Sequence, residues 1–283
     1  MTRHDAKRCF LLFLVLLTVQ LALAGLAAAQ EPAKIVQAQA ILTVSESKRL
    51  IAKGVAQMPI IKNALVNGMV IIGKGTTNAY VAEEITGRKI EKAAFVRGRV
   101  QPEKGGKKLP EVKVLPDVIL DKGKPVDMPL NEAVKQLKPG DVVIKGANAL
   151  DYKNRLAAVH IGDPSGGTTG IIMPYVVARK ACLVIPVGLE KLVAGDLVDL
   201  TLKMREPMET LNRLPSMFLL TGEIVTELEA IKVLTGATAF QCSAGGIGGA
   251  EGAVWLVFRG TREQVSGALK LVQSLQGEPP YVE

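Results

Sequence analysis

The stretch LVNGMVIIGKGTTNAYVAEEI, from Leu65 to Ile85, decides the fold of this chain. A short apolar run, Met69 to Ile72, ends in Gly-Lys-Gly-Thr-Thr-Asn, and apolar residues then return at helical spacing. This pattern predicts a strand over 69–73, a glycine loop and a helix over 78–86. Such a unit leaves the free N–H groups of a helix N-terminus beside glycines and hydroxyls, an arrangement that suits an anion.

The loop itself supplies a first set of candidate ligand-binding residues. Glycine lets the backbone approach an anion closely, two hydroxyls and an amide add donors, and a lysine adds positive charge. The spacing is neither that of a Walker P-loop nor that of the G-x-G-x-x-G dinucleotide loop. A tight strand-to-helix turn capped by threonine is the alternative interpretation. The candidates are Lys74, Gly75, Thr76, Thr77 and Asn78.

The N-terminal segment predicts export. Basic residues at positions 3, 7 and 8 precede an uncharged run, Cys9 to Ala29, which ends in three alanines. This pattern is typical of a secretory signal peptide over 1–29, and we expect a periplasmic or extracellular protein. The run is also long enough to span a bilayer, so a retained membrane anchor is the alternative. Residues 30–42 read as a linker.

The composition argues against some classes of partner. The net charge is +8, and removing residues 1–29, with three basic residues and one acidic residue, leaves a net charge of +6. This surplus favours anionic ligands, but it is diffuse, and only 4% of the residues are aromatic. Nucleic acid is therefore not expected as a partner. A membrane is expected only if the N-terminal segment is retained, and a homo-oligomer stays open.

Cysteine and histidine usage limits the possible chemistry. Cys182 and Cys242 lie in apolar, strand-like runs, where they are expected as buried free thiols; a disulfide between them is the alternative in an oxidising compartment. His160 is the only histidine beyond residue 29. A histidine-rich metal site and a Ser-His-Asp triad without His160 are therefore excluded. We predict no metal site and no cofactor.

The remaining periodicity predicts an α/β fold, with a mostly parallel sheet covered by helices on both faces. We assign 43–215 to this domain, with a β-hairpin insertion near 93–127. Residues 216–283 read as an α+β subdomain with a ferredoxin-like helix–hairpin–helix order. Capping boxes at Thr43, Thr226 and Thr261 predict the starts of three helices.

A second glycine and hydroxyl loop, Asp163 to Gly170, repeats the logic of the first, since it joins a predicted strand at 157–162 to a predicted helix at 170–180. Asp163 is a candidate acid or base, and an Asp-Pro turn before a capped helix is the alternative. The candidates for binding a second anionic group are Ser165, Gly166, Gly167, Thr168 and Thr169.

A third candidate segment, Lys145 to Asp151, leaves the C-terminal end of a predicted strand. Ligands of open α/β sheets bind at that edge. Asn148 is therefore a candidate ligand-binding residue, and Asp151 a candidate catalytic one, with a turn former and a solvated cap as the alternatives. Lys145 is the candidate electrostatic stabiliser.

The order of these pieces resembles the superfamily of ribose-5-phosphate isomerase, glucosamine-6-phosphate deaminase, CoA transferases and DeoR-type sensor domains. Asn67-Gly68, the strand from Met69 to Ile72 and Gly75-Thr76-Thr77 match its first motif. The isomerases carry Asp-Gly-Ala-Asp after a later strand, where this chain has Lys145-Gly146-Ala147-Asn148. The resemblance, over about residues 45–200, implies the fold and an anion site. The missing aspartates argue against isomerase activity.

Taken together, these patterns predict an exported protein that binds a small anionic metabolite, a phosphosugar or a carboxylate, between the 74–78 and 163–170 loops. Asp163 or Asp151 would act as general acid or base if the protein is an enzyme, with Lys145 stabilising charge. The alternative, from another class, is a non-catalytic component of the cell envelope whose apolar strands and glycine-rich hairpin serve assembly.

Overall fold

The computed structural model describes residues 34–98, 100–105 and 110–281. The expected signal peptide or anchor, and residues 30–33 of the expected linker, lie outside this range. The residues from Val36 onward form one compact unit. No helix within the described residues has the length and apolar character that a bilayer crossing requires.

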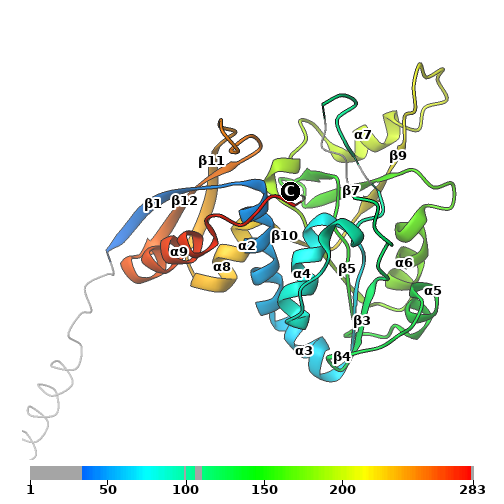
Figure 1. Ribbon diagram of the computed structural model, residues 1–283, viewed down its shortest axis with the longest axis horizontal. Coiled ribbons are helices and arrows are strands. Elements are labelled where there is room, and N and C mark those ends of the chain that lie inside the picture. Colours follow the sequence, from blue (N-terminus) through cyan, green and yellow to red (C-terminus); the bar gives the residue numbers. More distant parts are fainter. Residues whose placement is uncertain (1–33, 99, 106–109, 282–283) are drawn as a thin grey trace, which may run out of the picture. The chain divides into compact units, whose positions relative to one another are not determined.

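The main sheet of the described chain has six strands in the order β10-β8-β5-β2-β3-β4 (Figure 1). Four of them run parallel, namely β2 (Met69–Ile72), β5 (Val142–Ile144), β8 (Cys182–Pro186) and β10 (Glu223–Val225). An antiparallel hairpin, β3 (Val118–Asp121) and β4 (Lys124–Pro125), extends the sheet beyond β2. The β-hairpin expected near 93–127 spans 118–125 here, and it extends the main sheet through the pairing of β3 with β2.

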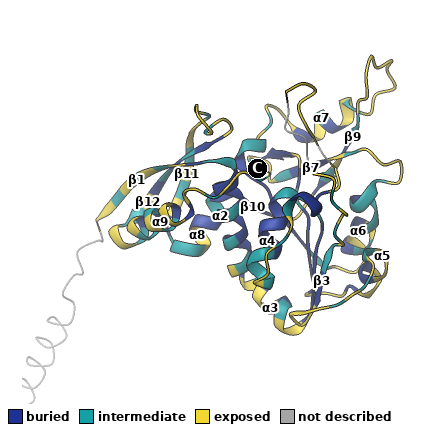
Figure 2. Ribbon diagram, viewed as in Figure 1, coloured by how far each residue is buried: buried dark blue, intermediate teal, exposed yellow. Residues whose placement is uncertain are grey.

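Helices cover both faces of this sheet, because its strands are apolar on both sides. Alternate residues of β2 point to opposite faces: Val70 and Ile72 belong to one core cluster, Met69 and Ile71 to another. The first cluster includes α2 (Val44–Gln57), α3 (Pro59–Asn67) and α4 (Thr76–Thr86). The second includes α5 (Leu130–Ala133), η2 (Val134–Gln136) and α6 (Gly167–Ala178). Figure 2 shows the strands between them as buried.

Two smaller sheets complete the unit. One is antiparallel and consists of β6 (Ala149–Asp151), β7 (Leu156–Ile161) and β9 (Ser216–Leu220). It contacts α7 (Leu197–Lys203). The other has the order β1-β12-β11, from β1 (Ile35–Leu42), β12 (Val254–Thr261) and β11 (Thr238–Ala244). The helices α8 (Glu227–Thr235) and α9 (Arg262–Leu275) accompany the second sheet. Two 3-10 turns are η1 (Lys92–Ala94) and η3 (Leu189–Lys191).

The α/β fold class is thus confirmed, whereas a mostly parallel sheet is not, since the main sheet includes the antiparallel strands β3 and β4 and the β6-β7-β9 sheet is antiparallel. The linker assignment is wrong for 35–42, which form β1: Val36, Ala38 and Ala40 pack on the core at every second position. The domain boundary expected at 216 does not separate two domains in the structure, because β9 and β10 pair with strands of the preceding domain. The helix–strand–strand–helix order after Thr226 is confirmed, and so are all three capping boxes.

The two cysteines within the described residues, Cys182 and Cys242, are free, as expected. Cys182 is half-buried at the start of β8, but Cys242 is exposed on β11, so the expectation of a buried thiol is wrong there. The alternation along β11 places Cys242 on the face that points away from the core.

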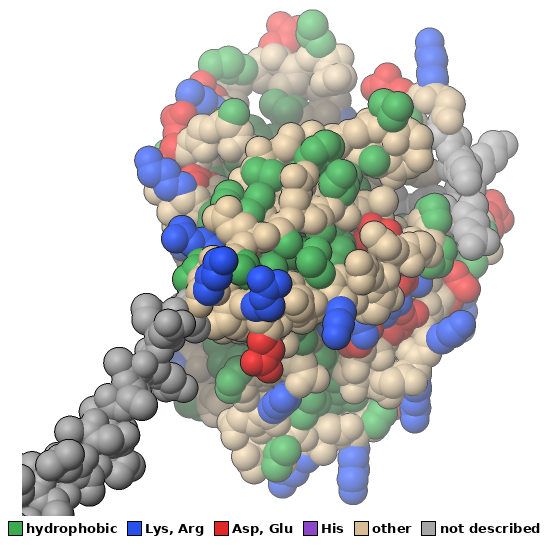
Figure 3. All heavy atoms as spheres, turned by 90° about the vertical axis from the view of Figure 1, so that its left-hand side faces the viewer, with side chains coloured by type: hydrophobic (Ala, Val, Ile, Leu, Met, Phe, Trp, Pro, Cys, Tyr) green, Lys and Arg blue, Asp and Glu red, His purple; other side chains and the backbone are tan. Residues whose placement is uncertain are grey.

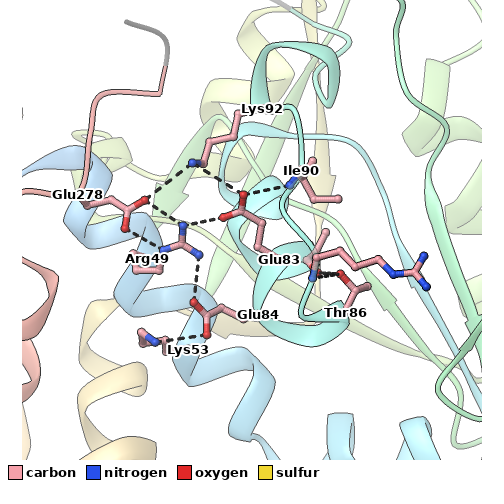
Figure 4. A network of polar contacts seen from close by, with 10 residues as sticks. Arg49, Lys53, Glu83, Glu84, Thr86, Ile90, Lys92 and Glu278 are labelled. Carbon is pink, nitrogen blue, oxygen red and sulfur yellow. Dashed lines mark hydrogen bonds and ion pairs between the residues drawn. The ribbon is translucent and has the colours of Figure 1, made fainter.

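A network of charged side chains holds α2, α4 and the C-terminal segment together (Figure 4). The Arg49 guanidinium lies 2.6 Å from a Glu83 oxygen, 3.0 Å from Glu84 and 2.9 Å from Glu278. It also stacks over the Tyr80 ring, 4.6 Å from its centroid. These contacts fix α2 beside α4, whose first turn enters the candidate site.

Candidate functional site

The four parallel strands of the main sheet end at one edge, and a polar or glycine-containing segment follows each of them. We call these segments the carboxyl edge. In open α/β sheets this edge is where ligands bind, because the apolar strands leave polar groups only at their ends. The carboxyl edge consists of Gly73–Asn78 after β2, Lys145–Ala147 after β5, Val187–Lys191 after β8 and Thr226-Glu227 after β10.

Lys145 lies at the centre of the carboxyl edge, since β5 pairs with β2 on one side and β8 on the other. Only 9% of the residue is exposed, and its ammonium donates a hydrogen bond to Gly146 O at 3.1 Å. Burial lowers the pKa of Lys145 to about 8; the Lys191 charge lowers it further and Asp117 opposes the shift. Lys145 is thus a buried cation whose hydrogen bond goes to a neutral oxygen.

Lys191 is the second cation of the edge. It follows β8 in η3, and its ammonium donates to Ala147 O at 3.0 Å. Lys145 and Lys191 therefore hold the same short loop, 145–147, and their charges act on each other. Like charges repel each other. An anion bound beside both lysines would offset this repulsion.

Lys74 differs from the prediction, because a carboxylate of the protein already pairs with it. Its ammonium lies 2.9 Å from Asp117 Oδ2, and its backbone N–H donates to Asp117 Oδ1 at 2.8 Å. Asp117 precedes β3, and sequence reasoning missed it because the contact depends on antiparallel pairing of β3 with β2. Lys74 consequently anchors its own loop.

The rest of the first loop is more enclosed than predicted. The helix begins at Thr76 and not at position 78, and the Gly75 N–H is occupied by Phe95 O at 3.0 Å. The fully buried Asn78 amide donates to Gly73 O at 2.6 Å and Ile144 O at 3.2 Å, which ties β2 to β5. Within the described residues, Thr77 Oγ1 and Asn78 Oδ1 are buried without a hydrogen-bond partner.

The second predicted loop does approach the first. A Cβ atom placed on Gly73 would lie 3.6 Å from Lys145 Cδ and 3.9 Å from Thr168 Cγ2. Thr168 stands in the first turn of α6, which starts early because Gly166 adopts a left-handed conformation, φ 83°. Lys145, the β2 loop and the α6 N-terminus therefore meet at one point.

Three other predicted residues accept hydrogen bonds from the protein itself. Asp163 is exposed and accepts the Ser165 hydroxyl at 2.5 Å and its N–H at 2.9 Å, which lowers the Asp163 pKa. Asn148 is exposed and accepts the His160 N–H at 3.1 Å. Asp151 accepts hydrogen bonds from the backbone and side chain of Asn154, which lower the Asp151 pKa.

Both aspartates therefore stabilise local structure, and the alternatives of a turn and a cap describe them better than acid–base roles. Asp163 accepts from Ser165 within its own turn, and Asn148 accepts from the backbone of His160 in the neighbouring strand β7. The three loops approach one another where Gly73 lies beside Lys145 and Thr168, and where Gly146 lies beside Asn78.

Two carboxyl groups, those of Glu190 and Glu227, complete the carboxyl edge. They were not predicted as a pair from the sequence. Glu227, at the start of α8, is fully buried and accepts the Leu189 N–H at 3.0 Å. Burial, and then the charge of Glu190, raise the pKa of Glu227 to about 7. Glu190 folds over Gly188, where a Cβ atom would stand 1.8 Å from Glu190 Oε2.

Lys48, in the first turns of α2, connects the carboxyl pair to the two cations. It is buried, and burial lowers its pKa to about 8, with Glu190 opposing the shift and Lys191 adding to it. The electrostatic contacts thus form a continuous row, Lys145, Lys191, Lys48, Glu190 and Glu227. A site with both cations and a protonatable carboxyl can bind an anion and exchange a proton with it.

Other features of the described chain lie apart from the carboxyl edge, among them a cavity with Lys53 and Lys62 in its lining. No group of three His, Cys, Asp or Glu residues there is arranged to hold a metal. A cavity of about 190 Å³ lies at the opposite ends of the parallel strands, beside Met69 and Asp141. Another of about 380 Å³ is lined by residues of α2, α3, α4 and α8, including Glu84. Neither contains residues of the carboxyl edge.

No protein-family model, curated protein or solved structure matches this chain. Any function assigned to it therefore rests on the residues of the site itself.

Proposed function

We propose that this chain is an exported protein that binds a small anionic metabolite, a phosphosugar or a carboxylate, at the carboxyl edge. The fold would be that of the isomerase, deaminase and CoA-transferase superfamily named above. One observation carries the proposal: Lys145 and Lys191 are two interacting cations, each of which hydrogen-bonds a neutral carbonyl oxygen at the end of a central parallel strand.

An anionic ligand follows from the cost of these charges. Burying an ammonium group without a counter-charge is unfavourable, and a second ammonium nearby adds repulsion. Lys74 already has Asp117, and Lys48 has Glu190, but Lys145 hydrogen-bonds only the Gly146 carbonyl within the described residues. A phosphate or carboxylate beside Lys145 and Lys191 would supply the missing charge. The first turn of α6, with Thr168 next to Lys145, would contribute N–H donors.

The same edge could support catalysis in an isomerase-like or transferase-like manner, although the aspartates of the isomerase motif are absent. Glu227 is buried and, with its pKa raised to about 7, can hold or release a proton near neutral pH. Lys145 would stabilise negative charge that develops on the ligand. In this role Glu227 replaces Asp163 and Asp151 as the acid–base candidate.

Thermal-shift measurements with the full mature chain test the proposal. The panel comprises ribose 5-phosphate, glucosamine 6-phosphate, pyruvate and citrate, with ribose and glycerol as uncharged controls. We expect at least one anion to raise the melting temperature of the wild type and to have a smaller effect on Lys191→Met. Lys203→Met, which removes an exposed lysine of α7 paired with Asp199, should respond like the wild type. Equal responses of all three proteins would contradict the site.

A second candidate function, a non-catalytic assembly component, is favoured by the outer face of the β1-β12-β11 sheet. Ile41 and Phe240 are 40% and 46% exposed there. Figure 3 views this side of the molecule and shows hydrophobic side chains gathered between Lys and Arg. The edge strand β1 carries no charge or proline, which leaves it open to pairing with β1 of a second copy.

Light scattering after size exclusion tests this second candidate. Ile41→Glu, on the edge strand β1, should convert a dimer to a monomer, while Leu211→Glu, at a 99% exposed position outside this sheet, should not. A wild type that is monomeric at all concentrations would contradict the assembly role.

A further inference from the structure

We infer that the Lys145 ε-amine is a nucleophile that forms an imine with the carbonyl carbon of the bound ligand. The ligand would then be an anionic aldehyde or ketone, such as a keto acid or the open-chain form of a phosphosugar. This inference deepens the proposed function and rests on it. It adds a covalent step and restricts the class of ligand.

The contacts of the four lysines at the edge single out Lys145. Lys74 is held by Asp117 at 2.9 Å, and Lys48 faces Glu190 and lies 5.7 Å from the centre of the Tyr281 ring. A carboxylate in direct contact keeps a lysine protonated, as at Lys74, and its nitrogen then has no lone pair to donate. Lys145 donates to the Gly146 carbonyl instead, a contact that does not favour the ammonium form as strongly as a carboxylate does. Lys48 has a pKa lowered to about 8, like Lys145, but it lies on α2 and not at the end of β5. Lys191 is the cation assigned to the acidic group of the ligand.

The surroundings of Lys145 favour its neutral, nucleophilic form. The side chain is buried at the end of the central strand β5, and the charge of Lys191 acts on it directly, while Asp117 opposes both effects. Burial and a neighbouring cation are the two conditions that activate lysines for attack on carbonyl carbon. With a pKa of about 8, a useful fraction of Lys145 is neutral at physiological pH.

The residues beside Lys145 are small. Gly73 and Gly146 have no side chain, and a Cβ on Gly73 would be in van der Waals contact with Lys145 Cδ, at 3.6 Å, so glycine there keeps another side chain away from Lys145. Thr168 lies at the same point, in the first turn of α6. The acidic group of the ligand would contact Lys191 and this turn, which would direct its carbonyl group to the Lys145 nitrogen.

The step balances without an oxidant or reductant. The lone pair of the neutral amine attacks the carbonyl carbon, the π electrons move to oxygen, and a proton passes from nitrogen to oxygen to give a carbinolamine. The carbon–oxygen bond then breaks, and the hydroxyl leaves as water after it takes up one proton. A protonated imine remains. One water molecule is released for each ligand bound.

Borohydride trapping tests the inference on the full mature chain. Pyruvate and glyceraldehyde 3-phosphate are the carbonyl probes, while lactate and glycerol 3-phosphate are the matched probes without a reactive carbonyl. We expect sodium borohydride to fix one carbonyl probe on the wild type, with peptide mapping placing it at Lys145 at least tenfold above any other lysine. Lys145→Arg should give no such adduct, and Lys203→Met should behave like the wild type.

The pH dependence of trapping distinguishes a nucleophilic lysine from one with a structural role. Removing the Lys191 charge in Lys191→Met should raise the pKa of Lys145, so that half-maximal trapping shifts to higher pH. An unchanged profile would contradict the activation described here.

Binding measured by calorimetry separates the two proposals. If a carbonyl probe binds the wild type but leaves no adduct at Lys145, the imine is overturned and the anion site stands. If neither probe binds, and no anion stabilises the protein, the proposed function fails as well. Adducts spread evenly over the surface lysines would also overturn the inference.

Discussion

The Lys74 ammonium lies 2.9 Å from the Asp117 carboxylate, and only 9% of either side chain is exposed. The Lys74 N–H donates to the same carboxylate, so Asp117 fixes both the side chain and the backbone of the glycine loop. This pair makes the most obvious cation of Gly-Lys-Gly-Thr-Thr-Asn a structural residue. The cations left for a ligand are Lys145 and Lys191.

Asp117→Asn should therefore destabilise the protein, because it leaves a nearly buried ammonium without its counter-charge. We expect a loss of about 3 kcal/mol in the free energy of unfolding. Urea denaturation at neutral pH measures it. Glu132→Gln removes an exposed partner of Lys135 and should cost less than about 1 kcal/mol. Similar values for the two variants would contradict the role of Asp117.

Arg49→Met should be more damaging than any single change at the surface, because the nearly buried Glu83 and Glu278 lose contacts of 2.6 and 2.9 Å and keep the more distant Lys92, at 3.9 Å. We expect a loss of about 3–5 kcal/mol, again measured with urea. Lys53→Met is the matched control on the same helix, since Lys53 is 36% exposed and pairs only with Glu84. Its cost should stay below about 1 kcal/mol. Equal losses would show that the network of Figure 4 contributes little.

Two glycine-to-alanine changes in helices should have opposite effects. In Gly54→Ala the new methyl group would stand 2.6 Å from the Ala230 Cβ of α8, so α2 and α8 must separate, at about 1–3 kcal/mol. Gly267 of α9 has no atom within 4 Å of the corresponding position, and Gly267→Ala should stabilise by about 0.5–1 kcal/mol. Thermal unfolding of both variants checks this. Destabilisation by Gly267→Ala, or tolerance of Gly54→Ala, would contradict the described packing.

Glu227 should make stability depend on pH in an unusual direction. Its pKa is about 7 in the folded protein, above the ordinary value of 4.5, so the folded state binds the proton more strongly. The resulting stabilisation is complete below pH 4.5 and is lost as the pH rises to about 7, by up to about 3 kcal/mol. Glu227→Gln, which cannot ionise, should lack this decline and be the more stable protein at pH 8.

Urea denaturation at several pH values between 4 and 8 measures that difference. The control is Glu223→Gln, since Glu223 is exposed at the start of β10, and it should follow the wild-type curve. Lys48 and Lys145 have a pKa lowered to about 8, so their effects fall above this range and are common to all three proteins. Parallel curves for Glu227→Gln and the wild type would contradict the environment described for Glu227.

Much of the fold could be predicted, because local signals specify it. The apolar strands 69–72, 142–144 and 182–186 were found from their composition, and the three helix starts from their capping boxes. The strand β1 was missed because its alternation is formed by alanine and glutamine, which carry little hydrophobic signal. The pairing of β10 with β8 was missed because no local pattern encodes which strands are neighbours.

The location of the site could be predicted from the sequence better than the residues that form it. Lys145 and Thr168 were found because the ends of parallel strands and the starts of helices can be read from the sequence. Asp117, Lys191 and Glu227 were not, since each belongs to the site through a contact with a distant segment. Glu227 did have a signal, as a carboxylate directly after a short apolar strand, but the capping box beside it suggested a purely local role.

Calorimetric titration of Lys145→Met tests the central claim most directly. The titrant is the anion that gives the largest thermal shift with the wild type, and Lys203→Met is the control for the loss of a positive charge. A charge-assisted contact predicts that Lys145→Met weakens binding at least tenfold, while Lys203→Met binds within about twofold of the wild type. Wild-type affinity in a folded Lys145→Met variant would contradict an anion site at the carboxyl edge.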